Sequence, residues 1–504
     1  MKRIVSVSAA LLFLKTFAFA VSFHSEGKES IVPPGIYDEL YDDGRANLAV
    51  VLDEFGMVGG VGDGVSLDYT GGGRLNEVNG IRIYKKGASL TGIGDIYADI
   101  NMNFTAQSSS SVAGIFLRGA SLAGEKFVFV DKIDVFSTGN SFATSTGINN
   151  YDSFIGGIKG RSDYSEIRAQ STGNSSFGIW NQVGAEIAGI SDIAVTAMDG
   201  KSQTYAIRND YGSQIGNISN AEIASSGYET SEVVGIYTEG SVGNLNGIKI
   251  EVSGAKKVYG AFLNWGSLGN LSDSSISSGG GTDTIGIYNA GGSFGELSNV
   301  KIYASGDGYA AGILLLDGGS VSLKNSSYVS AESSADSSAY SIANESAATA
   351  ILKGDSTIHT LNGDIYSDGK LVFDGNFKLQ NADIELGAGM DLSENSSLSW
   401  NGKLVIGGGT VVIGGGVVLN VYLEEPLVSG EYMVMENNSS IVLSDIDMNV
   451  FDSDGQILEN IEWELRHFES GDQLWIKAAI PEPSTYAAIF GALAIAFAAY
   501  RRRK

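Results

Sequence analysis

Side chains that could carry metal or acid–base chemistry are few in this sequence of 504 residues, and they lie far apart. The chain has three histidines, His24, His359 and His467, and no cysteine. A zinc site or a Ser-His-Asp arrangement needs several such groups to meet in space. The lack of cysteine excludes disulfides, thiolate metal sites and a cysteine nucleophile. We therefore expect no bound metal, no cofactor and no histidine-based catalytic site.

Six aspartates recur near predicted turns and are the main candidates for acidic chemistry. They are Asp192, Asp210, Asp273, Asp283, Asp307 and Asp317. Carboxylates gathered beside a basic residue would suit a polysaccharide lyase, and two carboxylates about 5 Å apart would suit a retaining glycosidase. The six stand at different offsets from the repeat described below, so we expect them to cap turns and solvate loops instead. The prediction is a protein without enzymatic activity, with a lyase or glycosidase as the alternative.

Aromatic residues recur around the same repeat and could bind a sugar. The set comprises Trp180, Tyr205, Tyr237, Trp265 and Tyr288. In Gly178-Ile179-Trp180 the tryptophan follows an isoleucine that should point inward, so its ring should point outward. An outward strip could stack on sugar rings, with Trp180 and Trp265 as the contacts. The alternative is a cross-strand aromatic ladder that stabilises a sheet without any ligand.

A repeat of 25 to 31 residues organises the middle of the chain. Each copy has a small residue, an apolar residue, any residue and then often asparagine. The copies are Gly147–Asn150, Gly178–Asn181, Ala206–Asn209, Gly235–Thr238, Ala261–Asn264, Gly286–Asn289, Gly312–Leu315 and Ser341–Asn344. Short segments of alternating apolar and polar residues follow, which is the pattern of β-strands. A repeat at this period indicates stacked structural units.

These observations predict an all-β fold, a right-handed parallel β-helix (solenoid) with a cap at each end. Stacked coils would bury each isoleucine on the next one. The recurring asparagines would form a ladder of amides. Ten to twelve coils about 4.8 Å apart would make a rod roughly 50 to 60 Å long. A β-propeller, whose blades repeat at roughly 40 to 50 residues, needs a longer period.

Both ends of the chain carry targeting signals. Met1-Lys2-Arg3 precedes an apolar run and the small residues Ala18 and Ala20, the pattern of a signal peptide with its cleavage site. Near the other end, Pro481-Glu482-Pro483 precedes an apolar segment and the basic cluster Arg501-Arg502-Arg503-Lys504. About 17 apolar residues are just enough for a transmembrane helix, and the basic cluster indicates a cytoplasmic end.

The expected domains follow from these signals and from the repeat. We expect a signal peptide at 1–20, an N-terminal cap at 21–75, β-helix repeats at 76–425, a C-terminal β cap at 426–479, and a sorting signal with a transmembrane helix at 480–504.

The C-terminal segment resembles the PEP-CTERM sorting signal of Gram-negative bacteria, and the β-rich body resembles the passenger domain of autotransporters. The first resemblance implies that an exosortase recognises Pro481, Glu482 and Pro483 and that the protein reaches the cell surface or the extracellular matrix, often beside exopolysaccharide. An ordinary, unprocessed membrane anchor is the alternative for this tail.

The charge of the chain fits export. The sequence has 32 basic and 58 acidic residues and a net charge of −26. Seven of the basic residues lie in the two end segments, so the body between them has 25 and a net charge of about −33. Such a surface repels nucleic acid, so we expect no nucleic-acid partner. The expected partners are signal peptidase, the exosortase and exopolysaccharide, and the expected function is that of a non-enzymatic, adhesin-like surface protein, with a carbohydrate-binding rod as another alternative.

Overall fold

The computed structural model describes residues 95–478, with gaps at 108, 123–125, 140, 228–231, 255, 335–338, 424–430 and 460. It also describes strand segments between residues 23 and 84, the residues 491–495 and residue 501. The predicted signal peptide, with Ala18 and Ala20, lies outside the described residues. So do Pro481-Glu482-Pro483 and the cluster residues Arg502, Arg503 and Lys504.

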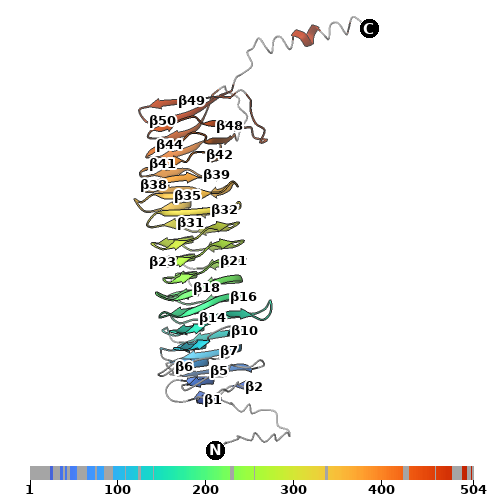
Figure 1. Ribbon diagram of the computed structural model, residues 1–504, viewed down its shortest axis with the longest axis vertical. Coiled ribbons are helices and arrows are strands. Elements are labelled where there is room, and N and C mark those ends of the chain that lie inside the picture. Colours follow the sequence, from blue (N-terminus) through green and yellow to red (C-terminus); the bar gives the residue numbers. More distant parts are fainter. Residues whose placement is uncertain are drawn as a thin grey trace, which may run out of the picture.

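The chain is all-β and coils into a column in which strands cross the long axis and follow one another from end to end (Figure 1). One set of strands, called sheet A, contributes one face of every coil. Sheet A contains β1 (Phe23–Glu26), β3 (Leu40–Tyr41), β4 (Ala46–Asp53), β6 (Glu77–Tyr84), β8 (Ser111–Arg118), β11 (Thr144–Tyr151), β15 (Ser175–Gln182), β17 (Gln203–Asn209), β19 (Glu232–Thr238), β23 (Lys257–Asn264), β27 (Asp283–Ala290), β31 (Tyr309–Leu315), β34 (Ala339–Asn344), β37 (Asp364–Ser367), β40 (Ile384–Leu386), β43 (Leu404–Gly407), β46 (Glu431–Asn437), β49 (Ile461–Phe468) and β50 (Gly471–Ala478).

The rest of each coil belongs to sheet B. Its strands are β2 (Gly35–Tyr37), β5 (Val65–Gly73), β7 (Ile96–Ala106), β9 (Ser121–Leu122), β10 (Val128–Thr138), β12 (Phe154–Ile155), β13 (Ile158–Gly160), β14 (Glu166–Ser171), β16 (Glu186–Met198), β18 (Gln214–Ser226), β20 (Ser241–Val242), β21 (Leu245–Asn246), β22 (Lys249–Ser253), β24 (Ser267–Leu268), β25 (Leu271–Ser272), β26 (Ser275–Gly279), β28 (Ser293–Phe294), β29 (Leu297–Ser298), β30 (Lys301–Gly306), β32 (Gly319–Lys324), β33 (Tyr328–Ser333), β35 (Ala350–Gly354), β36 (His359–Asn362), β38 (Lys370–Asp374), β39 (Asn376–Gln380), β41 (Gly389–Leu392), β42 (Ser397–Asn401), β44 (Thr410–Ile413), β45 (Val418–Tyr422), β47 (Ile441–Leu443) and β48 (Asp447–Phe451). The single strand β18 pairs with all three short strands β20, β21 and β22 of the next coil.

The strands of successive coils pair in parallel, as the repeat predicts. In sheet A the order is β1, β4, β6, β8, β11, β15, β17, β19, β23, β27, β31, β34, β37, β40, β43 and β46, each parallel to the next. These sixteen strands at about 4.8 Å give a rod of roughly 70 Å, so the expected ten to twelve coils were too few. Two causes explain the shortfall: β1 and β4 already pair in this order, and the later coils are narrow, with Ile365 and Ile384 paired only 19 residues apart.

The repeated motif sets the register. The apolar residue of each copy pairs with that of the next, from Ile148 through Ile179, Ile207 and Ile236, and again from Ile287 through Ile313 to Ile342. These isoleucines are at most 1% exposed and form a continuous interior stack. One copy was aligned wrongly. The structure pairs Ala261, not Phe262, with Ile236, so this copy begins at Gly260.

The motif glycine lies where sheet A presses against sheet B. A Cβ added to Gly260 would lie 2.2 Å from Cγ2 of Ile276 and 2.6 Å from the carbonyl oxygen of Gly286. The glycines in the other copies face the same pair of obstacles, an aliphatic side chain of sheet B and the backbone of the next coil. In these copies the missing side chain of glycine lets the two sheets approach. Two other coils have the small residues Ala206 and Ser341 at the same position.

The predicted amide ladder exists in three successive coils. Asn150 Nδ2 donates to Asn181 Oδ1 at 2.8 Å, and Asn181 Nδ2 donates to Asn209 Oδ1 at 2.9 Å. Asn209 then donates to the hydroxyl of Thr238 at 3.2 Å. The next coil has Leu263 at this position, so the ladder ends there.

At the C-terminal end the pairing changes direction. β50 pairs antiparallel with β46 and with β49. The solvent-facing residues of β49 include Glu462 and Glu464, charges that discourage pairing with another chain. Beyond β50, residues 491–495 are helical, and among the described residues no helix has the length and apolar character to cross a membrane.

A substitution at the motif glycine tests the close approach of the sheets. We expect Gly260→Ala to lower the free energy of unfolding by about 1–3 kcal/mol, because its Cβ overfills the interior. Gly415→Ala is the matched control, since a Cβ there meets nothing within 4 Å. The measurement is the denaturant midpoint of both variants, and equal midpoints would contradict the packing described.

Candidate functional site

Aromatic residues on the outer face of sheet A form one packed column that is separate from the interior. Ring centroids of neighbouring members lie 4.6–5.8 Å apart along Phe177, Trp180, Tyr205, Tyr237, Phe262, Tyr259 and Tyr288. The column contains four of the five predicted aromatic residues. It is a cross-strand aromatic ladder of the kind that stabilises a sheet.

The column fills a concave strip on the outer face of sheet A. The rings of Phe177 and Trp180, three residues apart, lie 4.6 Å from each other. In a straight strand such residues point to opposite faces. Because they touch, the strand bends outward-concave at the intervening Gly178 and Ile179, both of which are buried. The same bend therefore brings the motif glycine close to sheet B on the inner face and makes room for the aromatic column on the outer face.

Charged groups hold the N-terminal part of this column. The Arg208 guanidinium lies 5.3–5.6 Å from the ring centroids of Phe177, Trp180, Tyr205 and Tyr237. It forms an ion pair with Asp210 at 2.7 Å, and the Trp180 indole N–H donates to the same carboxylate at 2.8 Å. Trp180 is therefore surrounded by Phe177, Arg208 and Asp210, the contacts of a packed side chain.

The phenols of the column stay protonated and donate to carboxylates. The Tyr205 hydroxyl donates to Glu232, and the Tyr237 hydroxyl donates to Glu239. Burial, and then the carboxylate partner, raises the pKa of Tyr205 above its usual value and raises the pKa of Tyr237 to about 12. Both bonds hold a ring in position, and the bond from Tyr205 to Glu232 also links adjacent coils.

Trp265 is not part of the column. It lies in the turn between β23 and β24, two residues after Leu263, and is 73% exposed. The structure therefore does not bring Trp180 and Trp265 together, and only Trp265 presents a largely open indole.

The six aspartates are spread over several positions. Asp192 and Asp273 occupy the same corner three coils apart, where each accepts a hydrogen bond from an asparagine of the next coil, Asn220 at 3.2 Å and Asn299 at 2.7 Å. These four residues have a left-handed backbone, with φ between 49° and 56°, a conformation that Asp and Asn tolerate. Asp210 belongs to the aromatic column, Asp283 lies in β27, and Asp307 and Asp317 lie outside the strands. In the part of the chain that the structure describes, no three His, Asp or Glu residues are grouped as metal ligands.

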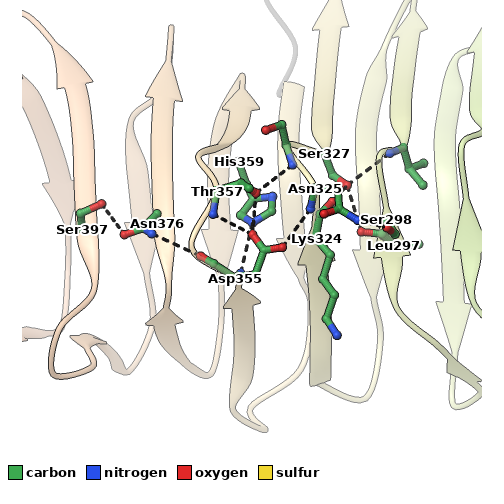
Figure 2. A network of polar contacts seen from close by, with 12 residues as sticks. Leu297, Ser298, Lys324, Asn325, Ser327, Asp355, Thr357, His359, Asn376 and Ser397 are labelled. Atoms are coloured by element: carbon green, nitrogen blue, oxygen red, sulfur yellow. Dashed lines mark hydrogen bonds and ion pairs between the residues drawn. The ribbon is translucent and has the colours of Figure 1, made fainter.

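Of the two histidines whose side chains are described, His359 is buried. The other, His467, is largely exposed and is hydrogen-bonded to Asp472. Figure 2 shows His359 beside Asp355 and Thr357 in a polar network that crosses neighbouring coils. His359 Nε2 lies 3.2 Å from Asp355 Oδ1 and 3.3 Å from the Asp355 backbone N–H. Its Nδ1 is buried and has no hydrogen-bond partner among the described residues.

The hydroxyls near His359 are engaged elsewhere. Thr357 donates to Asp355 at 2.5 Å, and Ser327 donates to the carbonyl oxygen of Leu297 at 2.9 Å. A Ser-His-Asp arrangement needs a hydroxyl bonded to the histidine. The network instead ties together turns of successive coils, for example through Asn325, whose backbone N–H donates to Asp355 at 3.1 Å (Figure 2).

The sequence reasoning missed a second ladder, in sheet B, and an open groove of about 470 Å³ beside it. Its triplets are Gly216–Ile218, Gly243–Leu245, Gly269–Leu271 and Gly295–Leu297. Asn217 Oδ1 accepts from the N–H of Asn244, Asn244 Oδ1 from that of Asn270, and Asn270 Oδ1 from that of Glu296, each at 2.9 Å. The signal was present: glycine, asparagine and an aliphatic residue recur at steps of 27 and 26 residues.

The groove is lined by neutral hydrogen-bonding groups over four coils. Beside the amide row stands a second row, Ser219, Asn246, Ser272 and Ser298. The acidic residue of the groove, Glu296 at the end of the amide row, forms an ion pair with Lys324 at 2.7 Å. Along an otherwise acidic rod this strip is close to uncharged, so it could hold a polar, uncharged ligand.

In comparisons with known proteins, no family model, curated protein or solved structure matches the chain. A proposed function therefore rests on the fold and on these surfaces.

The buried histidine predicts a loss of stability in mild acid. Burial lowers the folded-state pKa of His359 below its usual value of 6.5, although Asp355 partly opposes this shift. The unfolded chain then binds more protons as the pH falls, so stability present above about pH 6.5 is lost below it.

His359→Phe, which copies the paired residue Phe377 of the next coil, should reduce this acid dependence. The measurement is the denaturant midpoint at pH 7.5 and pH 5.5. The control, His467→Gln, alters a side chain that is 69% exposed and should keep the wild-type difference. An unchanged pH difference in His359→Phe would show that the buried ring is not its source.

Proposed function

We propose that this chain is an exported, non-enzymatic surface or matrix protein, a right-handed β-helical rod that an exosortase sorts through its C-terminal segment. The observation that carries the proposal is the continuous parallel pairing of the sheet A strands from β1 to β46. A column with one continuous interior holds its two ends at a fixed distance from each other. It therefore suits a spacer or adhesin-like element that holds its outer faces away from the cell.

The composition of the rod supports a place outside the cell. Its coils are held by backbone ladders, aliphatic stacks and amide bonds, and the sequence has no cysteine that an oxidising environment could alter. The net charge of −26 keeps such a long surface solvated and favours repulsion between rods. Association with exopolysaccharide then has to occur through local surfaces that are not strongly charged.

The two ends of the sequence support the route. The signal-peptide pattern ending at Ala18 and Ala20 provides export, and Pro481-Glu482-Pro483 with the cluster Arg501–Lys504 resembles a sorting signal. An exosortase would remove the basic end and release the rod from the membrane. The predicted span has to hold the precursor only until then.

Replacing Pro481, Glu482 and Pro483 with alanine tests this route. The chain and the variant are expressed in a host with an exosortase, and the mature C-terminus is identified by mass spectrometry. The wild-type product should lack Arg501–Lys504, and the variant should retain them because the recognition motif is gone.

The matched control replaces Ser484 and Thr485 with alanine, adjacent to the motif, and should be processed like the wild type. If the wild-type product also keeps Arg501–Lys504, the tail is a plain membrane anchor and the sorting proposal is wrong.

A further inference from the structure

We propose that Trp265 and the neutral groove that follows it in the chain form a binding surface for a non-acidic glycan. The inference rests on the proposed association with exopolysaccharide and names the part of the rod that would make the contact. Three features carry it: a strained and exposed tryptophan, polar groups around its ring, and unpaired amide donors in the groove.

Trp265 is held in a costly state. Its φ is +60°, a left-handed conformation that is rare for bulky residues and that costs on the order of 1–3 kcal/mol. It also leaves the largest apolar side chain 73% exposed. At the equivalent position of the next coil the residue is Gly291, with φ +76°, which adopts this conformation without strain. The fold therefore accommodates the turn without a tryptophan, so the ring itself calls for a role.

The next coil leaves room for the indole. In the following coil the equivalent position is occupied by a glycine, Gly291. A Cβ on Gly291 would lie 2.6 Å from Cε3 of Trp265 and 2.8 Å from Oδ2 of Asp317. The indole and this carboxylate thus both lie beside Gly291, and any other residue at that position would displace the ring.

The residue before Trp265 in the chain is polar and hydrogen-bonded. Asn264 Nδ2 donates to the Tyr237 hydroxyl at 3.0 Å and to Glu239 at 2.9 Å, which fixes the residue next to Trp265 against the previous coil. The Trp265 indole N–H has no hydrogen-bond partner among the described residues. An aromatic face attracts the positively polarised C–H groups of a pyranose ring, and the Asp317 carboxylate can accept hydrogen bonds from sugar hydroxyls.

The groove supplies matching donors a short distance along the same coil. Asn270 follows Trp265 by five residues, a span of at most about 18 Å in an extended chain. Asn217, Asn244 and Asn270 use their Oδ1 atoms in the ladder, and their Nδ2 groups have no hydrogen-bond partner within the described part of the protein. These amides repeat at the coil spacing of about 4.8 Å, close to the advance of one sugar unit in an extended glycan.

Charge selects the class of glycan. The body of the chain between its two end segments carries a net charge of about −33, so a polysaccharide with carboxylates or sulfates is repelled. The groove adds no compensating cation, because Lys324 is paired with Glu296. Neutral glycans, recognised through hydroxyl groups and ring faces, fit both parts of the surface.

The test is electrophoresis of the full chain in native gels that contain soluble polysaccharides. The neutral probes are hydroxyethyl cellulose, xyloglucan, galactomannan and dextran, and the acidic probe is polygalacturonate. We expect at least one neutral polysaccharide to retard the protein and polygalacturonate to leave its mobility unchanged. Retardation by none of the neutral probes, or by polygalacturonate alone, overturns the proposal.

Variants then separate a binding role from a structural one. Trp265→Gly should abolish retardation while its unfolding midpoint stays the same or rises, because glycine relieves the left-handed strain. Val183→Gly is the matched control: Val183 occupies the equivalent corner of an earlier coil, has φ +59° and is 50% exposed. It should likewise keep or raise the midpoint and should keep the retardation. Unchanged retardation in Trp265→Gly overturns the role of the indole.

The groove is tested by Asn244→Asp combined with Asn270→Asp. Aspartate keeps the oxygen that accepts the backbone N–H of the next coil but loses the amide donors, so the fold should persist and retardation should weaken severalfold. Full retention of binding overturns the role of the groove. C-terminal processing is independent of these changes, so failure here with normal processing rejects the glycan site and leaves the sorting proposal standing.

Discussion

The constraint on which the rest of this structure depends is the stacking of identical positions in successive coils. Parallel, in-register hydrogen bonding places each residue against its counterpart one coil away, so in most coils an inward isoleucine meets another, as Ile287 meets Ile313. The glycine before it lets sheet A reach the aliphatic side chains of sheet B. A single side chain at Gly260 or Gly286 would keep the two sheets apart in that coil and disturb the coils on either side.

The same constraint shapes the exterior. The bend at the motif glycine creates a concave strip outside sheet A, and aromatic rings fill it. At the corners, amides and carboxylates bond to the next coil, as Asn299 does to Asp273. Most polar side chains at these positions are therefore used within the fold. Places where a ladder leaves groups unpaired, such as the Nδ2 atoms of Asn244 and Asn270, are where the rod has chemistry left for a ligand.

The fold was predictable from the sequence to the extent that its repeat is strict. The parallel coils, the isoleucine stack and the amide ladder of Asn150, Asn181 and Asn209 follow from the spacing of one motif. The register at Ala261 was not, because Gly260 and Ala261 are both small and only packing against Ile276 distinguishes them. The right-handed sense, the sorting signal and the function remain predictions.

The candidate site was less predictable because it depends on exceptions to the repeat. Trp180 and Trp265 looked alike as aromatic residues near the motif, yet one packs in the column and the other is exposed in a left-handed turn, a conformation that no propensity assigns to tryptophan. The burial of His359 depends on its pairing with Phe377. The Gly-Asn-Leu triplets were visible but short, and their side-chain bonds depend on a turn that only the three-dimensional structure defines.

The absence of cysteine allows a direct test of the central claim, the parallel in-register stacking. Glu251 and Ser277 are exposed register partners on adjacent coils. Their Cα atoms should lie about 4.8 Å apart, within reach of a disulfide. The stacking predicts that Glu251→Cys with Ser277→Cys forms an intramolecular disulfide on mild oxidation. Glu251→Cys with Ser278→Cys, one residue out of register and with Ser278 facing the interior, should not. Equal or preferential cross-linking of the second pair would contradict the register and with it the β-helical account.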